Sequence, residues 1–437
     1  MSDIVLVQPP MPEHLRQYAR EVIVCPPLGL GYLASTLLEN GFEVELTDLS
    51  IENPDRKGIE LELRRRNPKI LGITTTTSTY KNALNVATIA KELDPNIVTI
   101  LGGPHVTFTD EETLRNRQVD VVVRHEGELT MLELCQRLLR ENKELGPVAG
   151  ISYREDNVIV KNSDRPVIEN LDALPFPARH LMQLDKYLSP GTVITSRGCP
   201  SKCIFCAAEA MSGGKYRVRS PSNVVAEIKK VADDFNPKFF FIADDTFTVF
   251  RDRTREICKL LHNLPKKVEW VCESRANFID KPTLQEMAEA GCTAIQFGVE
   301  SGSQKILNSI KKGINLDQVR RAVRWAVETK ILPVCSFMVP HSEDTWKTVK
   351  ETKKFMLELK DMGAFIYVSM TTPFPGTTLY LHAKELGVTI VTDDTDKYDL
   401  TGESPVIRTR NLSVEAIKAA YNDLVSICPE EPPYLKR

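Results

Sequence analysis

The segment Gly198-Cys199-Pro200-Ser201-Lys202-Cys203-Ile204-Phe205-Cys206 places three cysteines in a C-x3-C-x2-C pattern. Thiolates this close together on one short loop can converge on a soft metal ion or on an iron–sulfur cluster. Three ligands complete neither a tetrahedral zinc site nor the usual four-cysteine set of an iron–sulfur cluster. Either a fourth ligand comes from elsewhere in the chain, or a cluster on this loop keeps one iron open to a small molecule. The alternative is a structural zinc loop completed by a remote cysteine, for which Cys272, Cys292 and Cys335 are available.

The cysteine loop follows the first strand of a regular strand–helix alternation in the second half of the chain. The strand candidates are Thr192–Thr195, Phe239–Ile242, Glu269–Cys272, Ala294–Phe297, Leu332–Val339 and Phe365–Met370. The helix candidates between them are Ser222–Phe235, Thr254–Asn263, Thr283–Ala290, Leu316–Thr329 and Thr345–Leu359. Six such units in a row predict a partial (β/α)6 barrel, and the active sites of parallel barrels gather at the carboxyl ends of the strands.

The first 145 residues alternate in the same way, with short Val/Ile/Leu strands that are typical of a parallel sheet buried on both faces. They predict a doubly wound, Rossmann-like α/β domain, in which ligands bind outside the carboxyl ends of the strands. No G-x-G-x-x-G follows the first strand, which disfavours a nicotinamide cofactor. The turns after the strands are rich in glycine and hydroxyl groups, which suits a large polar ligand close to the backbone. These turns are Gln8-Pro9-Pro10, Thr75-Thr76-Thr77-Ser78, Gly102-Gly103-Pro104-His105 and Arg124-His125-Glu126-Gly127-Glu128.

A proline-rich stretch separates the two halves, with a small hairpin expected around Ile151–Val160. The predicted organisation is therefore a cofactor-binding domain at 1–145, a linker at 146–190 and a barrel at 191–385. The remaining residues, 386–437, include a helix at Val414–Val425 and are expected to cover part of the barrel opening.

Composition narrows the class of protein. The 437 residues carry 56 Lys+Arg and 59 Asp+Glu, a formal net charge of −3, and this balance favours neither nucleic acid nor an anionic membrane as a partner. No apolar run approaches the roughly 18 residues of a membrane span, and the first ten residues do not resemble a signal peptide. We therefore expect a cytoplasmic protein, whose ten cysteines are not a disulfide framework.

The cysteine loop, with Phe205 directly before its last cysteine, resembles the signature of the radical S-adenosylmethionine (SAM) superfamily. The resemblance implies that Cys199, Cys203 and Cys206 hold a 4Fe–4S cluster, and that Phe205 packs near the adenine of SAM. The ends of the next strands resemble the SAM-binding segments of that superfamily. They imply contacts from Asp244 and Asp245 to the methionine amino group, from Arg275 to its carboxylate, and from Glu300 and Ser301 to the ribose and carboxylate.

The first half resembles the cobalamin-binding domain that precedes the barrel in one large radical SAM subfamily. The resemblance rests on Pro26-Pro27-Leu28-Gly29-Leu30-Gly31-Tyr32 and on the glycine-rich turns. It extends to Thr372-Pro373-Phe374-Pro375-Gly376-Thr377 at the end of the barrel. No D-x-H-x-x-G motif offers a histidine ligand to cobalt, as is common in that subfamily. The implied cobalamin-binding residues are Gly29, Thr75, Thr76, Gly102, Gly103, His105, Glu126 and Gly127.

The implied function is that of a cobalamin-dependent radical SAM enzyme. Reductive cleavage of SAM gives a 5′-deoxyadenosyl radical that abstracts hydrogen from a small-molecule substrate, and methylcobalamin then delivers a methyl group to carbon. An external donor of the flavodoxin or ferredoxin type supplies the electron. The alternative is an enzyme with the same two domains that does not use cobalamin and catalyses dehydration, deoxygenation or epimerisation of a sugar or antibiotic precursor.

Two further residues are catalytic candidates in the barrel. His341 replaces the glycine usual at the end of the fifth strand, and its charge titrates near neutral pH, so it is a candidate acid, base or hydrogen-bond donor. Cys335 lies within the same strand and is a candidate hydrogen donor if it faces the lumen. A methylthiotransferase is disfavoured, because only Cys25 and Cys135 lie in the first half, too few for a second cluster.

Overall fold

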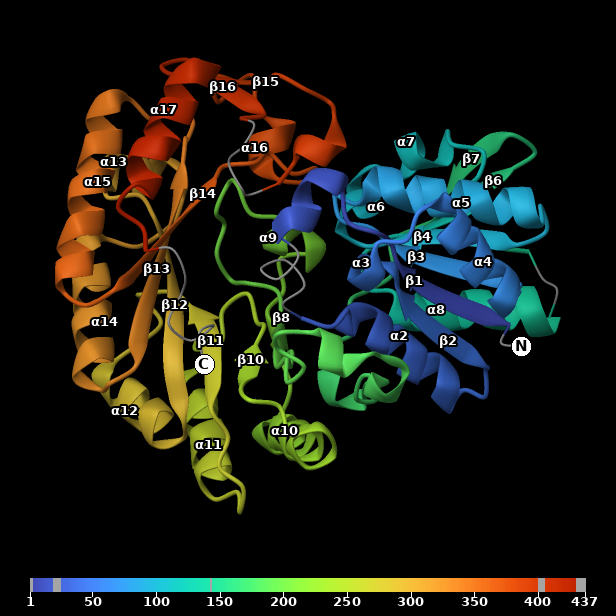
Figure 1. The fold of residues 1–437 in the computed structure, drawn as a ribbon, viewed down its shortest axis with the longest axis horizontal. Coiled ribbons are helices and arrows are strands. Elements are labelled where there is room, and N and C mark those ends of the chain that lie inside the picture. Colours follow the sequence, from blue (N-terminus) through green and yellow to red (C-terminus); the bar gives the residue numbers. More distant parts are fainter. Residues whose placement is uncertain (1–2, 19–24, 142–143, 400–404, 430–437) are drawn as a thin grey trace. The chain divides into compact units, whose positions relative to one another are not determined.

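The computed structural model describes residues 3–18, 25–141, 144–399 and 405–429, which form two compact units, Met1–Pro190 and Gly191–Arg437 (Figure 1). The helices and strands of the first unit are β1 Ile4–Gln8, η1 Glu13–Tyr18, α2 Leu28–Glu39, β2 Val44–Asp48, α3 Leu49–Glu52, α4 Arg56–Arg66, β3 Ile70–Thr74, α5 Tyr80–Leu93, β4 Val98–Gly102, α6 Pro104–Phe108, α7 Asp110–Leu114, β5 Val121–Val123, α8 Glu128–Cys135, η2 Gln136–Glu141, β6 Ile151–Glu155, β7 Val158–Lys161, η3 Leu171–Ala173, η4 Arg179–Leu181 and η5 Leu184–Lys186.

The described part of the first unit contains a seven-stranded sheet in the order β2-β1-β3-β4-β5-β6-β7. Strands β1 to β5 are parallel, and their side chains are largely buried on both faces. Helices α2 and α8 pack on one face of the sheet and α4 and α5 on the other (Figure 1). The chain passes from β2 across β1 to β3, so the switch point lies between β1 and β3. This is the doubly wound fold that the sequence predicts, and its ligand edge carries the predicted turns.

The predicted linker needs correction, because its hairpin belongs to the sheet of the first unit. Strand β6 pairs antiparallel with β5, and β7 pairs antiparallel with β6. This pairing satisfies the edge hydrogen bonds of the three-residue strand β5, which would otherwise be left open. The first unit therefore extends to Pro190 rather than ending near 145.

The second unit is the barrel, and its described helices and strands are β8 Ser196–Arg197, α9 Ala208–Met211, β9 Arg217–Val218, α10 Pro221–Phe235, β10 Phe240–Ile242, α11 Arg251–His262, β11 Trp270–Ser274, α12 Lys281–Glu289, β12 Cys292–Glu300, α13 Gln304–Ser309, α14 Leu316–Glu328, β13 Leu332–Val339, α15 Trp346–Asp361, β14 Phe365–Met370, α16 Thr378–Leu381, β15 Val388–Ile390, η6 Thr395–Lys397, β16 Ile407–Thr409 and α17 Val414–Val425.

Strands β10 to β14 form a five-stranded parallel sheet, with the helices packed on its outer face in one large apolar core. The first of the six predicted strands is reduced to a single parallel bridge between Val193 and Ile242. The chain turns away at Ser196 because β8 pairs with β9 instead. Helix starts follow local capping rules: Ser220 caps α10 directly before Pro221, and Asn315 forms a capping box with Gln318 at α14.

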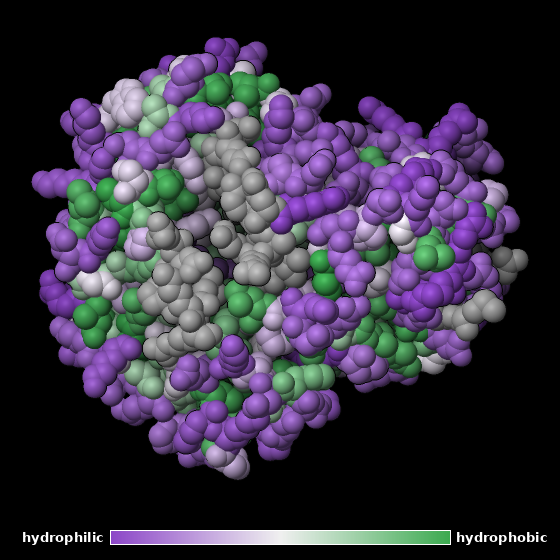
Figure 2. Space-filling model, in the orientation of Figure 1, coloured by the Kyte–Doolittle hydropathy of each residue, from purple (hydrophilic) through white to green (hydrophobic). Residues whose placement is uncertain are grey.

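The C-terminal segment differs in part from the predicted cover. Helix α17 packs on the outer face of the barrel against β13, β14 and α15, because Ile417, Ala420 and Leu424 complete the apolar core there. The hairpin β15–β16 forms its own small cluster, which packs against Phe205 of the cysteine loop. Figure 2 shows a mostly hydrophilic face with hydrophobic residues in scattered groups. Residues 400–404 and 430–437 of the predicted cover lie outside the described residues.

Candidate active site

Two backbone hydrogen bonds of Ile204 hold the cysteine loop in place. Ile204 N donates to Ile310 O, and Leu379 N donates to Ile204 O, so elements far along the chain fix the loop from both sides. Gly198 begins the loop with φ +85°, and a Cβ there would lie 2.2 Å from Lys215 O. The loop geometry therefore requires glycine at this position.

Each of the three thiols has a different polar neighbour. Cys199 Sγ lies 3.5 Å from Thr246 Oγ1, Arg275 Nη1 donates to Cys203 Sγ at 3.4 Å, and Ala208 N donates to Cys206 Sγ at 3.5 Å. Partial desolvation, followed by smaller contributions from Asp245 and the other two cysteines, raises the pKa of Cys206 to about 11. The loop therefore releases a proton from Cys206 when a metal centre binds.

The donor set fits a 4Fe–4S cluster. Cys199, Cys203 and Cys206 are all free thiols, and the influence of the other two on Cys206 shows that the three lie near one another. Among the described residues, no three His, Cys, Asp or Glu side chains gather tightly enough for a single metal ion. A cube of four irons bonds each cysteine through a different iron, so its ligands can lie further apart.

Asp244 and Asp245, which follow β10, have different hydrogen-bond surroundings. Asp244 accepts four hydrogen bonds, from the backbone N–H and the hydroxyl of both Thr195 and Ser196, at 2.5–3.0 Å. These contacts use the lone-pair positions of a carboxylate, so Asp244 ties Thr195 and Ser196 to the end of β10. Its contact with the SAM amino group stays a prediction. Asp245 lies at the loop: Gly198 N donates to it, while desolvation and the charge of Asp244 raise its pKa. Of the two, Asp245 is the one available to a ligand.

Arg275 supports the cysteine loop. Besides Cys203, its guanidinium donates to Lys312 O and, at 3.4 Å, to Asn277 Oδ1. The side chain is almost completely buried. These contacts orient a predicted cluster ligand, and the contact of Arg275 with the SAM carboxylate stays a prediction.

Phe205 and His341 lie together with a buried ion pair. Lys312 Nζ donates to Glu300 Oε1 at 2.6 Å, with both side chains nearly inaccessible. The Phe205 ring lies 5.9 Å from Lys312 Nζ and 5.9 Å, centroid to centroid, from the His341 ring. His341 is buried, and its Nε2 lies 3.3 Å from Glu300 O. The structure therefore brings Phe205, Glu300 and His341 into one wall and adds Lys312, which no motif indicated.

Ser301 and Cys335 have structural surroundings that the sequence did not show. Ser301 Oγ lies 3.1 Å from Thr352 Oγ1 and accepts from Ser303 N, so it closes a turn between β12 and α15. Its contact with the ribose or carboxylate of SAM stays a prediction. Cys335 shares the face of β13 with Phe337 and Val339 and is fully buried in the apolar core. Because side chains alternate along a strand, Cys335 points away from the lumen and cannot serve there as a hydrogen donor.

The sequence analysis also missed Glu273, which lies on β11 between Cys272 and Ser274. Trp270 and Cys272 pack in the outer apolar core, so the alternation of side chains along the strand directs Glu273 into the barrel. Desolvation, with the charges of Asp245 and Glu300, raises the pKa of Glu273 to about 7, and Lys312 partly offsets this. A charged residue in the middle of an apolar strand was the signal available in the sequence.

In the first unit, the turns after β3 and β4 interlock. Thr75 N and Oγ1 both donate to Gly102 O, at 2.8 Å each. Gly103 has φ +102°, and a Cβ there would lie 2.5 Å from Thr75 O. Thr76 is exposed, with its hydroxyl 2.9 Å from Thr79 Oγ1. Thr75, Thr76, Gly102 and Gly103 therefore form one continuous cradle of backbone and hydroxyl groups at the ligand edge of the sheet.

His105 closes this cradle from α6. Its ring packs against Tyr80 in a tilted arrangement with centroids 4.3 Å apart, and its Nδ1 lies 3.2 Å from Thr77 Oγ1. Burial lowers the pKa of His105 to about 4, so the imidazole is neutral at physiological pH. The packing orients the ring as a neutral hydrogen-bonding group beside the cradle.

The pKa of His105 predicts an acid sensitivity of the first unit. Below pH 6.5 the unfolded chain binds a proton at this position, whereas the folded protein does not until about pH 4. We therefore expect His105 to contribute a loss of about 2 kcal/mol of unfolding free energy between pH 7.5 and 5. The His105→Gln variant should lack this loss. The difference is measured by urea unfolding of the whole chain at both pH values, followed by hydrogen exchange in peptides of the first unit. Equal losses of unfolding free energy in the wild type and in His105→Gln would contradict the prediction.

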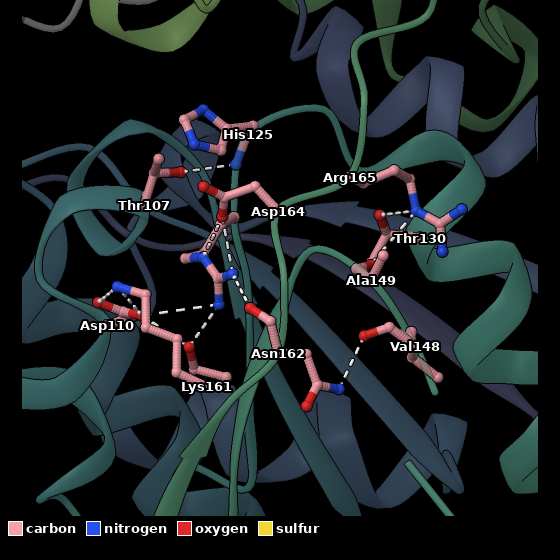
Figure 3. A network of polar contacts seen from close by, with 12 residues as sticks. Thr107, Asp110, His125, Thr130, Val148, Ala149, Lys161, Asn162, Asp164 and Arg165 are labelled. Atoms are coloured by element: carbon pink, nitrogen blue, oxygen red, sulfur yellow. Dashed lines mark hydrogen bonds and ion pairs between the residues drawn. The ribbon is translucent and has the colours of Figure 1, made fainter. Parts of the chain in front are cut away.

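A buried arginine, Arg124, anchors the turn after β5. Figure 3 shows the network of polar contacts around it, including Asn162, Asp164 and the contact between His125 and Thr107. Arg124 donates to Asp164 Oδ1 at 2.7 and 3.0 Å, to Ser152 Oγ at 2.5 Å and to Asn162 O at 2.6 Å. Directly after it, His125 adopts φ +60°, the left-handed region that favours glycine, and its N–H donates to Thr107 Oγ1. The network fixes where the following residues of the turn lie.

Glu126 and Gly127 have different surroundings. Glu126 Oε2 accepts from Ile168 N at 2.7 Å, so this carboxylate fastens the segment after β7 to the turn. Gly127 precedes α8, where a Cβ would meet Leu33 at 3.1 Å. Gly29, in the first turn of α2, is exposed and has no atom within 4 Å of a built Cβ. The backbone at Gly29 is thus open to close approach by another molecule.

Gly103 and Gly29 offer a matched test of the cradle. Gly103→Ala places a Cβ against Thr75 in a strained conformation, and we expect it to cost at least about 1–3 kcal/mol and to abolish cobalamin retention. Gly29→Ala adds a methyl group in open space within a helix and should stabilise the chain by about 0.5–1 kcal/mol while weakening cobalamin retention. Urea unfolding and the absorbance of cobalamin retained after desalting report both effects. Full retention by both variants would rule out this cradle.

Comparison with known proteins agrees with this geometry. Residues 193–356 match the radical SAM superfamily model, and residues 22–135 match the B12 binding domain model. An uncharacterized methyltransferase of Pyrococcus horikoshii is 35% identical over 420 residues, covering 95% of this chain and 89% of the relative. The anaerobic magnesium-protoporphyrin IX monomethyl ester cyclase of Rubrivivax gelatinosus is 30% identical over 397 residues, covering 88% and 70%.

The fold has a close counterpart among solved structures. The radical SAM methyltransferase TsrM from Kitasatospora setae, solved with cobalamin and a 4Fe–4S cluster, superposes with a TM-score of 0.80 at 18% identity, covering 100% of this chain and 94% of that one. In the described residues, every helix is too short or too polar to cross a membrane. The B12 match disfavours the alternative enzyme without cobalamin. The cysteine loop, the glycine-rich cradle and the relatives together show that the chain belongs to the radical SAM superfamily, among its cobalamin-dependent members with an N-terminal B12-binding domain.

Proposed function

We propose that this enzyme transfers a methyl group to an unactivated carbon of a small molecule. The observation that carries the proposal is the presence, in one chain, of a three-cysteine loop and of a glycine-rich turn at Gly103 within a region that matches the B12 binding domain model. When bound, the cluster and SAM supply radical chemistry, and cobalamin supplies a transferable methyl group. The Pyrococcus relative is named a methyltransferase, which supports this reaction over the ring formation of the Rubrivivax relative.

The chain's own residues position and protect these groups. Cys199, Cys203 and Cys206 hold the cluster, and Arg275 orients Cys203 through its hydrogen bond to the sulfur. Asp245 is the acceptor for the SAM amino group, and the Phe205 ring lies against its adenine. His341 completes the wall beside Phe205 and excludes water from it.

The proposed setting is a reducing one. The ten cysteines are free, and Cys206 is partly exposed at the loop, where oxidation would prevent cluster binding. We infer a cytoplasmic location and an external electron donor of the flavodoxin or ferredoxin type.

Reconstitution tests the proposed reaction. The chain is loaded anaerobically with iron and sulfide, with and without hydroxocobalamin, and is then given SAM and a reductant. Retained base-off cobalamin, with both 5′-deoxyadenosine and S-adenosylhomocysteine formed, is the expected result. Formation of 5′-deoxyadenosine without S-adenosylhomocysteine would indicate ring formation or another radical reaction instead of methyl transfer. If a chain with an intact cluster cleaved no SAM, that result would contradict radical chemistry altogether.

A further inference from the structure

The inner surface of the barrel carries polar side chains that the proposed cofactor contacts do not use. Along β11, β12 and β13, the residues in the outer core alternate with residues that face the lumen. Three of the latter are polar, Glu273, Gln296 and Ser336, and Glu273 and Gln296 are direct neighbours in the sheet register. The three side chains make no hydrogen bond or ion pair within the described part of the chain.

Glu273 differs from the other acidic groups near it. Glu300 is neutralised by Lys312, and Asp244 accepts four hydrogen bonds. Glu273 has neither kind of partner among the described residues, although desolvation already raises its pKa to about 7. A partly desolvated carboxylate without a partner is unfavourable for the folded state. The free protein therefore gains nothing from this residue that a glutamine would not provide.

A second observation points to a ligand in the same lumen. Thr371 follows β14, and Met370 before it lies in the outer core, so Thr371 continues the alternation onto the inner face. It is 1% exposed, and its Oγ1 has no hydrogen-bond partner. Buried hydroxyl groups in folded proteins are nearly always satisfied, so Thr371 Oγ1 is free to bond to a bound molecule or to an ordered water.

We propose that Glu273 is the cation-binding residue of the barrel lumen and receives a positively charged group of a bound molecule, with Gln296, Ser336 and Thr371 supplying neutral hydrogen bonds. The charge has two possible sources, the sulfonium or ammonium group of SAM and a protonated nitrogen of the methyl acceptor. The second source rests on the proposed methyl transfer and specifies its acceptor as a nitrogen-bearing cation.

The unfolding midpoint of variants distinguishes a ligand-binding role of Glu273 from a structural role. In Glu273→Gln the unpaired carboxylate becomes a neutral amide of the same size, so the unfolding midpoint of the free protein should stay equal or rise. Glu300→Gln is the matched control: it leaves Lys312 buried without its partner, and its midpoint should fall. A fall in Glu273→Gln as large as that in Glu300→Gln would show a structural role and overturn the proposal.

Binding then identifies the source of the charge. Equilibrium dialysis with the cluster-loaded protein, without reductant, measures the affinities for SAM and for S-adenosylhomocysteine, which lacks the sulfonium charge. If SAM is the source, Glu273→Gln should bind SAM at least about tenfold more weakly. Equal weakening for both molecules assigns the contact to the ammonium group, and weakening for SAM alone assigns it to the sulfonium.

The methyl acceptor is tested with a small-molecule extract of cells that naturally contain this protein. The extract is first separated on cation and anion exchangers, and each fraction is then incubated with the holoenzyme, a reductant and methyl-labelled SAM. If the methyl acceptor carries the positive charge that Glu273 binds, the wild-type chain should transfer label to a molecule of the fraction retained on the cation exchanger. The Glu273→Gln variant should not. Unchanged SAM affinity together with labelling that Glu273→Gln leaves intact would overturn the proposal. If no fraction is labelled, the proposed methyl transfer fails, while the stability and dialysis results still decide the role of Glu273.

Discussion

The Cys203→Ala variant is expected to lose its iron and, with it, all cleavage of SAM. Cys203 is one of three thiols on a single loop, and two remaining ligands cannot hold a cluster whose fourth iron is open. Loss of groups that only support a metal ligand typically costs about 10–100-fold, so loss of the ligand itself should exceed this range. Iron content and 5′-deoxyadenosine formation after anaerobic reconstitution measure the effect.

Two variants give this result its controls. Cys428→Ala removes a thiol near the C-terminal end of the described chain and should leave iron content unchanged. Arg275→Gln keeps all three cysteines but loses the guanidinium contact with Cys203, so activity should fall by about 10–100-fold while iron is retained. Wild-type activity in Cys203→Ala would show that this loop does not hold the reactive centre.

The Lys312→Met variant is expected to produce the largest loss of stability. Lys312 and Glu300 form an ion pair in which each side chain is less than a tenth exposed. Removing the lysine leaves Glu300 charged, buried and unpaired, at an expected cost of about 3–5 kcal/mol. Glu300 also has φ +70° beside a register shift in β12, so it cannot readily turn toward water. Urea unfolding of the whole chain measures the change.

A surface pair and a double variant test the reason for this loss. Lys281 and Glu328 form an ion pair of similar length, 2.7 Å, with both side chains exposed. Lys281→Met should cost no more than about 1 kcal/mol, because water already screens that pair. Lys312→Met combined with Glu300→Leu should recover most of the lost stability, since no charge then remains buried. A similar small loss in Lys312→Met and Lys281→Met would mean that Glu300 finds another partner.

Much of the fold could be predicted from local patterns. The helix at Val414–Val425 and the strands at Leu332–Val339 and Phe365–Met370 have the predicted bounds, because each is a run of residues with one clear period between polar breaks. The hairpin at Ile151–Lys161 was predicted as a hairpin but assigned to a linker. Its partner, the short strand Val121–Val123, lies some thirty residues earlier, and no local pattern shows that pairing.

The residues of the candidate site also fall into those that local sequence patterns indicate and those that depend on distant contacts. The cysteine loop and Gly103 could be identified because spacing and residue type alone limit what they can do. Asp244, Ser301 and Arg275 were assigned to SAM, yet their polar atoms meet Thr195, Thr352 and Cys203, each more than forty residues away. Lys312 and Glu273 were missed because their importance comes from burial beside other charges, a property that sequence spacing does not carry.

The sequence by itself thus determined the chemistry that this protein can support: three thiols on one loop and a glycine-rich edge on a doubly wound sheet. These follow from backbone sterics and ligand type, which act over a few residues. Only the tertiary structure decided which polar groups are already satisfied by the protein and which remain for a ligand. That depends on contacts between distant segments and on exclusion of water, and it separates Asp244, with four donors, from Glu273, with none among the described residues.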